Sequence, residues 1–355
     1  GNHRSGNHRS GVATVEHPVR AVVLVGGKGT RLRPLTLTTP KQMLPVGGRP
    51  MLERVLAHLD AYGIGDVVLS LGYRPDAFLS AYPGGTCAGV RLHYAVEPEP
   101  LDTAGAIAFA ARHAEITEAF LVVNGDVLTD LNVAALIKLH RTRGAEATIA
   151  LTPVDDPSAF GVVSTDGADR VTAFIEKPPP GQAPTNLINA GTYVLEPTVV
   201  DLIAPDRRTS IEREIFPALV ERGSLYAMAS DASWIDAGTS ETYRRANLSW
   251  ARRRGDRGGV HPGASVSDGA RIDNSVIGTG SVVTEGATVT ASVLLDGVRV
   301  GSGATVTDSV IGYRGTIGAG ATVGPGVILG DDVVLAEGAV VATAVDPGDP
   351  TQPPR

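Results

Sequence analysis

A glycine-rich turn with basic residues lies near the start of the chain and could bind phosphate. Residues 24–36 read Leu-Val-Gly-Gly-Lys-Gly-Thr-Arg-Leu-Arg-Pro-Leu-Thr. Glycines let the backbone approach an anion so that successive N–H groups converge on it, and Arg31 and the later Lys41 add positive charge. The segment lacks the ending of a Walker loop and the spacing of a dinucleotide-binding turn. It predicts a phosphate site of another kind, whose turn residues are Gly26, Gly27, Gly29 and Thr30.

The elements that must position this turn alternate between two kinds. Short apolar runs predict strands, and apolar residues at helical spacing predict helices between them. The strands are expected over 21–25, 67–71 and 120–123, and the helices over 51–62 and 131–141. This alternation predicts a Rossmann-like α/β domain with a mixed, mainly parallel sheet, whose ligands bind at the carboxyl ends of the strands.

After residue 254 the pattern changes to a short, fixed repeat. Aliphatic residues recur at steps of 6, 6 and 5, and Gly and small polar residues separate them. Three short strands per coil would bury one aliphatic side chain from each face, which is the pattern of a left-handed parallel β-helix built from hexapeptide repeats. The predicted axial positions are Val260, Val266, Ile272, Ile277, Val283, Val289, Leu294, Val300, Val306, Ile311, Ile317, Val323, Ile328, Val334 and Val340.

Composition excludes several classes of function. The formal net charge of -7 comes without a basic patch beyond 252–254, so we expect no nucleic-acid partner. One cysteine, Cys87, excludes a disulfide framework within the chain. No run approaches the roughly 20 apolar residues that span a bilayer, so we expect a cytoplasmic protein with no membrane partner.

Five later motifs accompany the glycine-rich turn. In chain order they are Asn124-Gly125-Asp126, Phe160-Gly161-Val162, Glu176-Lys177-Pro178, Asn189-Ala190-Gly191 and Trp234-Ile235-Asp236-Ala237-Gly238-Thr239. Together with the turn, and in this order, they resemble the sugar-phosphate nucleotidyltransferase family. The resemblance extends over about residues 20–345, because many members also carry a C-terminal left-handed β-helix. Within the family the chain resembles the mannose-1-phosphate guanylyltransferases.

The resemblance assigns a role to each matching residue. Arg31, Lys41 and Lys177 would be catalytic, and Asp126 and Asp236 would jointly hold Mg²⁺, which prefers carboxylate and phosphate oxygens. As an alternative, Asp126 could cap the following helix, although Asp130 is better placed for that. The remaining nucleotide contacts would be Gly125, Glu97 and Thr103 with the glycine-rich turn, and the sugar-phosphate contacts would be Gly161, Glu176, Lys177 and Asn189.

The reaction expected of such a site is the coupling of a sugar 1-phosphate to a nucleoside triphosphate with release of pyrophosphate. A phosphate dianion is already a nucleophile, so positioning and charge neutralisation suffice and no general base is expected.

The base and the sugar are predicted from fewer residues. Thymidylyl- and uridylyltransferases usually present a glutamine near the position of Glu97. A carboxylate, in contrast, can accept hydrogen bonds from both adjacent N–H donors of guanine. Glu97 therefore favours GTP, with Glu99 as the alternative contact, and the β-helix then favours mannose 1-phosphate. Asp102 stands where the family usually has a glycine, which leaves the base less certain than the reaction.

Other interpretations remain open. The substrate pair could be glucose 1-phosphate with an adenylyl or thymidylyl donor, or another sugar or cyclitol phosphate. More remote alternatives are a non-catalytic regulatory subunit and a hexapeptide acyltransferase, which typically needs a histidine along the coils, where only His261 occurs. The β-helix is expected to mediate oligomerisation or allosteric control, and we expect a homo-oligomer. The expected divisions are 1–18 (disordered), 19–254 (catalytic domain), 255–345 (β-helix) and 346–355 (disordered).

Overall fold

The computed structural model describes residues 19–72, 74–253 and 259–342. The predicted disordered segments 1–18 and 346–355, and the predicted boundary between residues 254 and 255, lie outside these residues. The chain forms two compact units: the first contains 19–26 and 53–234, and the second contains 27–52 and 235–342. From Gly27 onward, the glycine-rich segment thus belongs to the same unit as the C-terminal repeats.

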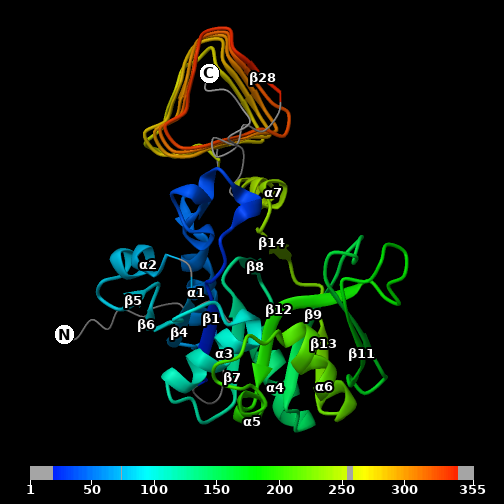
Figure 1. Ribbon diagram of the computed structural model, residues 1–355. Coiled ribbons are helices and arrows are strands. Elements are labelled where there is room, and N and C mark those ends of the chain that lie inside the picture. Colours follow the sequence, from blue (N-terminus) through cyan, green and yellow to red (C-terminus); the bar gives the residue numbers. More distant parts are fainter. Residues whose placement is uncertain (1–18, 73, 254–258, 343–355) are drawn as a thin grey trace, which may run out of the picture. The chain divides into compact units, whose positions relative to one another are not determined.

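The first unit is built on a ten-stranded sheet of order β11-β10-β12-β7-β1-β4-β6-β5, with β9 paired to both β12 and β13 (Figure 1). Its centre is parallel, since β1 pairs with β4 and β7 in that sense, and β10, β11 and β12 are antiparallel. The strands are β1 (Ala21–Leu24), β4 (Asp66–Leu71), β5 (Thr86–Cys87), β6 (Val90–Val96), β7 (Phe120–Asn124), β9 (Ala147–Pro153), β10 (Gly161–Thr165), β11 (Val171–Glu176), β12 (Leu187–Leu195) and β13 (Leu225–Ala229). A mixed, mainly parallel α/β sheet is confirmed.

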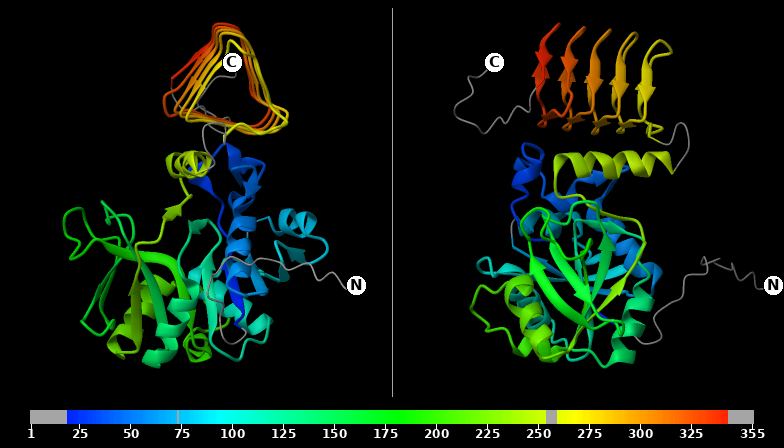
Figure 2. Two further views of the ribbon diagram at one scale, coloured as in Figure 1. Left: turned by 180° about the vertical axis from the view of Figure 1, so that it is seen from behind. Right: turned by 90° about the vertical axis from the view of Figure 1, so that its right-hand side faces the viewer.

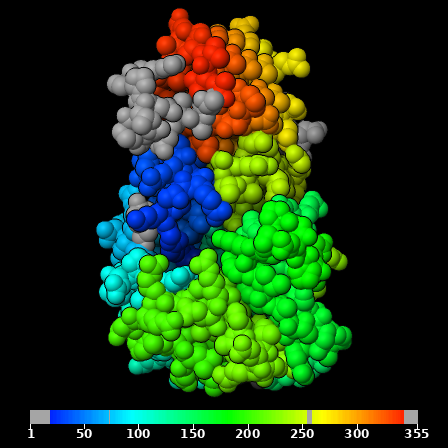
Figure 3. Space-filling view, turned by 45° about the vertical axis from the view of Figure 1, so that its right-hand side comes forward, coloured from blue at the N-terminus to red at the C-terminus, as the bar shows by residue number. Residues whose placement is uncertain are grey.

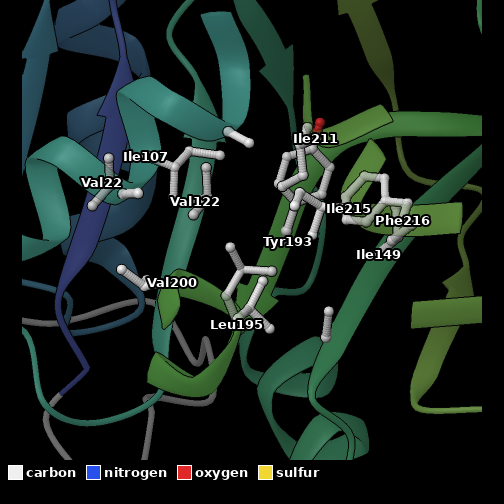
Figure 4. Packing of buried hydrophobic residues seen from close by; sticks show 14 of the residues in the cluster. Val22, Ile107, Val122, Ile149, Tyr193, Leu195, Val200, Ile211, Ile215 and Phe216 are labelled. Carbon is white, nitrogen blue, oxygen red and sulfur yellow. The ribbon is translucent and has the colours of Figure 1, made fainter. Parts of the chain in front are cut away.

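Helices cover this sheet: α3 packs on β1, β4 and β6, and α4 packs on β9 and β13. The core between the layers includes Val22, Val122, Tyr193 and Phe216, all at most 1% exposed (Figure 4). Helical elements of this unit are α1 (Met51–Ala61, of which Glu53 onward belongs here), α2 (Pro75–Ala81), α3 (Asp102–His113), α4 (Val133–Arg143), α5 (Pro197–Asp201), the π-helical turn η4 (Ile211–Ile215) and α6 (Phe216–Glu221).

One buried histidine gives the first unit a predictable pH response. His140 is 1% exposed, with Nδ1 2.9 Å from Thr148 Oγ1 and Nε2 3.2 Å from Glu196 Oε1. Burial lowers the pKa of His140, and the opposing effect of Glu196 is smaller. The unfolded chain therefore binds more protons than the folded one just below pH 6.5, so stability falls as the pH falls from that value.

We expect His140→Gln to flatten this dependence. Melting temperatures of the wild type and the variant should converge between pH 7.5 and 5.5, while exposed His113→Gln should follow the wild type. Parallel melting curves for wild type and His140→Gln would contradict this assignment.

The second unit joins the glycine-rich segment to the repeats through α7 (Ser240–Arg252). Tyr243 Oη donates to Pro45 O at 2.6 Å, and Asn247 Oδ1 accepts from Gly47 N at 2.9 Å. On its other side, Arg244 Nη1 donates to Ala291 O at 2.7 Å. The short elements around these contacts are η1 (Thr30–Leu32), η2 (Leu35–Leu37), η3 (Lys41–Met43), β2 (Pro45–Val46), β3 (Arg49–Pro50) and β14 (Trp234–Asp236), whose last two residues belong to this unit.

The repeats form a parallel β-helix of three sheets, with strand orders β15-β18-β21-β24-β27, β16-β19-β22-β25-β28 and β17-β20-β23-β26 (Figure 2). Successive coils, coloured yellow to red, lie directly against one another (Figure 3). Their bounds are β15 (Ser265–Val266), β16 (Arg271–Asp273), β17 (Val276–Ile277), β18 (Val282–Val283), β19 (Thr288–Thr290), β20 (Val293–Leu294), β21 (Arg299–Val300), β22 (Thr305–Thr307), β23 (Val310–Ile311), β24 (Thr316–Ile317), β25 (Thr322–Val323), β26 (Ile328–Leu329), β27 (Val334–Leu335) and β28 (Val340–Val341).

A serine at one corner of three successive coils explains part of the repeated motif. Ser275 Oγ accepts from Ser292 N at 3.1 Å, and Ser292 Oγ accepts from Ser309 N at 3.0 Å. All three serines are buried, so this ladder satisfies backbone groups that water cannot reach.

The predicted register is wrong in the last coil. Ile311 pairs with Leu329, one residue beyond the expected partner, and Val334 and Val340 are 72% and 69% exposed. The axial positions there are instead Leu329, Leu335 and Val341, so the predictions for Ile328, Val334 and Val340 are corrected.

An extra residue near Gly324 causes this slip. Gly324 has φ +109°, and a Cβ there would lie 1.9 Å from Thr307 O, so only glycine fits. Because strand side chains alternate between faces, a shift of one residue turns the predicted aliphatics outward.

Among the helices in the described part of the chain, none has both the length and the apolar character needed to cross a bilayer.

Candidate active site

The glycine-rich turn in the second unit is tightly closed. Gly27 and Gly29 have φ +94° and +61°, in the region that favours glycine. Thr36 Oγ1 donates to Gly29 O at 2.7 Å. A Cβ added at Gly29 would lie 2.9 Å from Thr36 Cγ2 and 3.3 Å from Lys41 Cβ. The turn therefore brings Lys41 beside its own backbone, as a phosphate site requires, and Thr30 follows as the first residue of η1.

Arg31 and Asp236 approach each other around Gly238, also within the second unit. A Cβ added at Gly238 would lie 3.0 Å from Arg31 Nη2 and 2.7 Å from Asp236 Oδ1. Gly238 N donates to the same carboxylate oxygen at 2.9 Å. Two segments two hundred residues apart thus place a guanidinium and a carboxylate together, a combination that suits a phosphate and its counter-cation.

The close approach at Gly238 predicts the effect of one methyl group. We expect Gly238→Ala to lower kcat by roughly tenfold or more, because displacing catalytic groups by a fraction of an ångström is costly. The melting temperature should change little, since Gly238 is not among the positive-φ residues. The matched control is Gly167→Ala, where a Cβ meets nothing within 4 Å. Equal kcat for both variants would contradict the assignment.

The first unit presents Asp126 at the end of its central parallel strand. Asn124, Gly125 and Asp126 form the turn from β7 into β8 (Val127–Thr129). Gly125 N donates to Leu24 O at 2.9 Å, which fixes the turn beside the end of β1, where Gly26 follows. Asp126 is half-buried at this carboxyl edge, the edge at which α/β sheets bind ligands. The helix that follows is capped by Asn132, whose side chain accepts from Ala135 N, so the suggested cap at Asp130 is wrong.

Four predicted sugar-phosphate residues lie on neighbouring strands of the first unit. Gly161 faces Glu176 across β10 and β11, and a Cβ at Gly161 would lie 3.0 Å from Glu176 Oε2. Lys177 is 59% exposed, with Nζ 4.0 Å from Glu176 Oε1. Asn189, on β12, accepts from Gly191 N at 2.9 Å and donates to Tyr193 Oη at 3.0 Å. The four residues therefore surround one polar region at the strand ends.

The charge of Glu176 depends on its surroundings. Burial raises the pKa of this carboxyl, and the nearby negative charge of Glu212 raises it further. Lys177 and Arg213 act in the opposite direction. A carboxylate in such a setting is a ready acceptor for sugar hydroxyls.

Glu97 and Thr103 are both held by hydrogen bonds within the first unit. Glu97 Oε2 accepts from Leu101 N at 3.0 Å, and Oε1 accepts from Ser70 Oγ at 3.4 Å. Burial raises the pKa of Glu97, and these two hydrogen bonds oppose it. Glu97 therefore closes the loop that precedes α3, and the alternative contact, Glu99, is exposed.

Asp102 adopts the conformation that explains the glycine usual in the family. Its φ is +64°, and its Oδ1 accepts from Thr103 N at 2.8 Å. Aspartate is among the few residues that tolerate this region by such local hydrogen bonds. The departure from the family pattern thus keeps the backbone path of the loop.

Sequence reasoning missed Glu212, which contacts Thr103. Glu212 Oε2 accepts from Thr103 Oγ1 at 2.7 Å. A serine followed by acidic residues, as in 210–214, indicates the start of a helix, and nothing in that pattern shows that it returns to α3.

Together, the fold and the candidate site indicate the class of protein to which the chain belongs. A glycine-rich turn with Arg31 and Lys41, a mixed sheet with Asp126 at the carboxyl edge of its parallel strands and a β-helix are combined in one chain. The chain matches the nucleotidyl transferase family over residues 20–253 and the GMPPB C-terminal domain over residues 256–345. It belongs to the nucleotidyl transferase family.

Two named relatives are similar to well over half of this chain. Mannose-1-phosphate guanylyltransferase of Mycobacterium tuberculosis is 44% identical over 274 residues, which cover 74% of this chain and 76% of the relative. Mannose-1-phosphate guanyltransferase of Yarrowia lipolytica is 41% identical, covering 63% of this chain and 62% of the relative.

Solved structures of two further proteins are also similar to this chain. HddC from Yersinia pseudotuberculosis has a TM-score of 0.57 at 30% identity, covering 65% of this chain and 99% of that one. It has also been solved in complex with GMP-PN. A putative glucose-1-phosphate thymidylyltransferase from Bacillus anthracis has a TM-score of 0.59 at 26% identity, covering 64% and 94%.

Proposed function

We propose that the protein transfers GMP from GTP to mannose 1-phosphate, forming GDP-mannose and pyrophosphate. The observation that carries the reaction class is the approach of Arg31 and Asp236 around Gly238, beside a glycine-rich turn that holds Lys41. The names of the relatives support mannose 1-phosphate and GTP. Glu97, an acceptor-only group, supports guanine.

The reaction joins a phosphate oxygen of the sugar phosphate to the α-phosphorus of the triphosphate and breaks the bond to the β-phosphate. The turn from Gly26 to Thr30 would bind the triphosphate, with Arg31 and Lys41 neutralising its charge. Lys177 would hold the sugar phosphate, and Glu176, Asn189 and Gly161 would orient the sugar. The attacking oxygen already carries negative charge, so catalysis rests on alignment and charge neutralisation.

Asp126 and Asp236 would hold Mg²⁺ together. Carboxylate oxygens are the donors that Mg²⁺ prefers, and it usually takes one or two from the protein and completes its shell with phosphate oxygens and water. Within 19–72, 74–253 and 259–342, no three His, Cys, Asp or Glu side chains gather as a metal site. When bound, the cation supplies positive charge to the reacting phosphates.

Three further assignments accompany the proposal. We infer a cytoplasmic protein, since nucleoside triphosphates and sugar phosphates are cytoplasmic substrates. The division into a catalytic domain over 19–254 and a β-helix over 255–345 is supported by the two family matches. The stacked coils favour a homo-oligomer.

The test is pyrophosphate release with Mg²⁺, mannose 1-phosphate and each of GTP, ATP, UTP, CTP and dTTP in parallel. We expect release with GTP and its loss in Asp126→Asn. A preference for ATP or dTTP would replace the guanylyl assignment with the adenylyl or thymidylyl alternative. No release with any triphosphate, across a panel of sugar phosphates, would contradict the enzyme assignment.

Glu97 carries a separate prediction about the base. We expect Glu97→Gln to lower kcat/KM for GTP by roughly tenfold to a hundredfold, since one good paired contact contributes on the order of 1–3 kcal/mol, and to raise the relative use of dTTP. The amide oxygen can still accept from Leu101 N, so the loop should keep its shape. Glu99→Gln is the matched control. If only Glu99→Gln changed base preference, Glu99 would be the reader.

A further inference from the structure

The proposed mechanism assigns the loop at 97–103 to the nucleotide and the residues around Glu176 and Asn189 to the sugar phosphate. Glu212 lies between these two parts of the proposed site. Its Oε2 accepts from Thr103 Oγ1 at 2.7 Å and from Ser210 Oγ at 2.9 Å. Thr103 Oγ1 in turn accepts from Ile211 N at 2.9 Å. Glu212 therefore holds the side chain of Thr103, in the first turn of α3, and also stabilises its own turn.

The backbone reinforces this connection. Ala104 N donates to Thr209 O at 2.9 Å, and Thr209 N donates to Leu101 O at 3.0 Å. A Cβ at Gly105 would lie 2.7 Å from Leu101 Cβ and 3.2 Å from Arg207 O. The start of α3 and the segment 207–211 are thus packed directly against each other and joined by backbone hydrogen bonds.

The turn η4, which carries Glu212, packs into the core near Asn189, one of the proposed sugar-phosphate residues. Ile211 and Ile215 lie next to Tyr193 and Phe216 in the buried cluster (Figure 4). Tyr193 Oη accepts from Asn189 Nδ2 at 3.0 Å, and the charge of Glu212 contributes to raising the pKa of Tyr193. Asp126 and Glu176 raise the pKa of Tyr193 in the same way, although burial is the largest cause.

The turn η4, which carries Glu212, packs against β11, the strand that ends at Glu176. The negative charge of Glu212 is the largest electrostatic influence that raises the pKa of Glu176, and Lys177 and Arg213 oppose it. The same carboxylate, Glu212, therefore accepts the hydrogen bond from Thr103 and raises the pKa of Glu176.

We infer that Glu212 is a positioning residue that couples the nucleotide-binding loop at 97–103 to the sugar-phosphate pocket around Glu176 and Asn189. This inference rests on the proposed function. Glu212 touches neither reacting phosphate: it acts through Thr103 on one side and Glu176 on the other. Ordering of either substrate site then favours the ordering of the other.

The test separates hydrogen bonding from charge with two variants. Glu212→Gln keeps an oxygen that can accept from Thr103 but removes the charge. We expect the KM for GTP to stay within about threefold. The acid limb of kcat/KM for the sugar phosphate should move to lower pH, because the pKa of Glu176 falls when the negative charge is removed. Glu212→Ala loses both and should raise the KM of both substrates by about tenfold.

A double-variant cycle tests the coupling itself. Thr103→Val alone should raise the KM for GTP, and adding it to Glu212→Ala should raise this KM by a smaller factor than in the wild type, since both variants remove the hydrogen bond between Thr103 and Glu212. Additive effects would show that the two side chains act independently and would overturn the inference. The matched control is Glu214→Gln, on the same turn, whose carboxylate pairs with Arg207 and accepts from Ser210 N. It should leave the pH profile unchanged.

Two readouts separate this inference from the proposed function. Binding of a non-hydrolysable GTP analogue by calorimetry, with and without mannose 1-phosphate, reports coupling without turnover: the sugar phosphate should strengthen analogue binding in the wild type but not in Glu212→Ala. If the wild type catalyses transfer but Glu212→Gln has an unshifted profile and both variants keep the coupling, the inference alone fails. If the wild type catalyses no transfer, the proposed function fails. Should Glu212→Ala not fold, Glu212→Gln and Thr103→Val still decide.

Discussion

Asp236→Asn is expected to lower kcat by roughly a thousandfold while leaving the fold intact. Losing one preorganised electrostatic group at a reacting centre commonly costs a hundredfold to a thousandfold, and here the lost charge would also weaken the metal site. The asparagine oxygen can still accept from Gly238 N, so the turn should persist. Steady-state rates over a range of Mg²⁺ concentrations check the effect, and high Mg²⁺ should restore part of the activity.

The control for this variant is Asp231→Asn, an exposed acid five residues earlier. It should match the wild type at every Mg²⁺ concentration. If Asp236→Asn retained more than a tenth of the wild-type kcat with the same Mg²⁺ dependence, Asp236 would not be a metal ligand.

Arg31→Ala should lower kcat/KM for the nucleotide by about a hundredfold to a thousandfold. The guanidinium offers paired donors to phosphate oxygens, and its place beside Asp236 and Gly238 fixes where those donors lie. Arg31→Lys keeps the charge without the fork and should fall between the wild type and Arg31→Ala. Initial rates at subsaturating GTP measure this order.

Arg33→Ala provides the matched comparison, since Arg33 is exposed in the same segment. We expect its kcat/KM to stay within about threefold of the wild type. Equal losses at both positions would mean that the segment attracts the triphosphate only through its overall charge, and the specific role of Arg31 would be wrong.

The sequence predicted elements whose signal is local. The apolar run of β1 and the 3-4 spacing of α1 are visible in the chain itself, and both elements lie where expected. The repeats were predictable because each coil places aliphatics on the axis. The prediction failed after Gly324, because a single extra residue in a corner leaves the composition unchanged but reverses the faces of the strands that follow.

For the candidate site, the sequence predicts local features where a motif is present. Glycines that need positive φ, such as Gly29, and the acidic turn at Asp126 are recognisable from residue type and position. The partners of these residues were not. The contact between Glu212 and Thr103 joins positions more than one hundred residues apart, and only tertiary packing brings them together. For the same reason, the sequence led us to expect a base contact at Glu97 but did not show that this residue closes its own loop.

The most direct test of the account follows the phosphates of GTP. The protein is incubated with Mg²⁺, mannose 1-phosphate and GTP labelled at either the α- or the γ-phosphate, and the products are separated by chromatography. We expect the α-label to enter a phosphatase-resistant nucleotide sugar with the mobility of GDP-mannose and the γ-label to appear in pyrophosphate, in equal amounts. Appearance of the γ-label as inorganic phosphate and of the α-label as GDP, in the absence of any nucleotide sugar, would contradict nucleotidyl transfer.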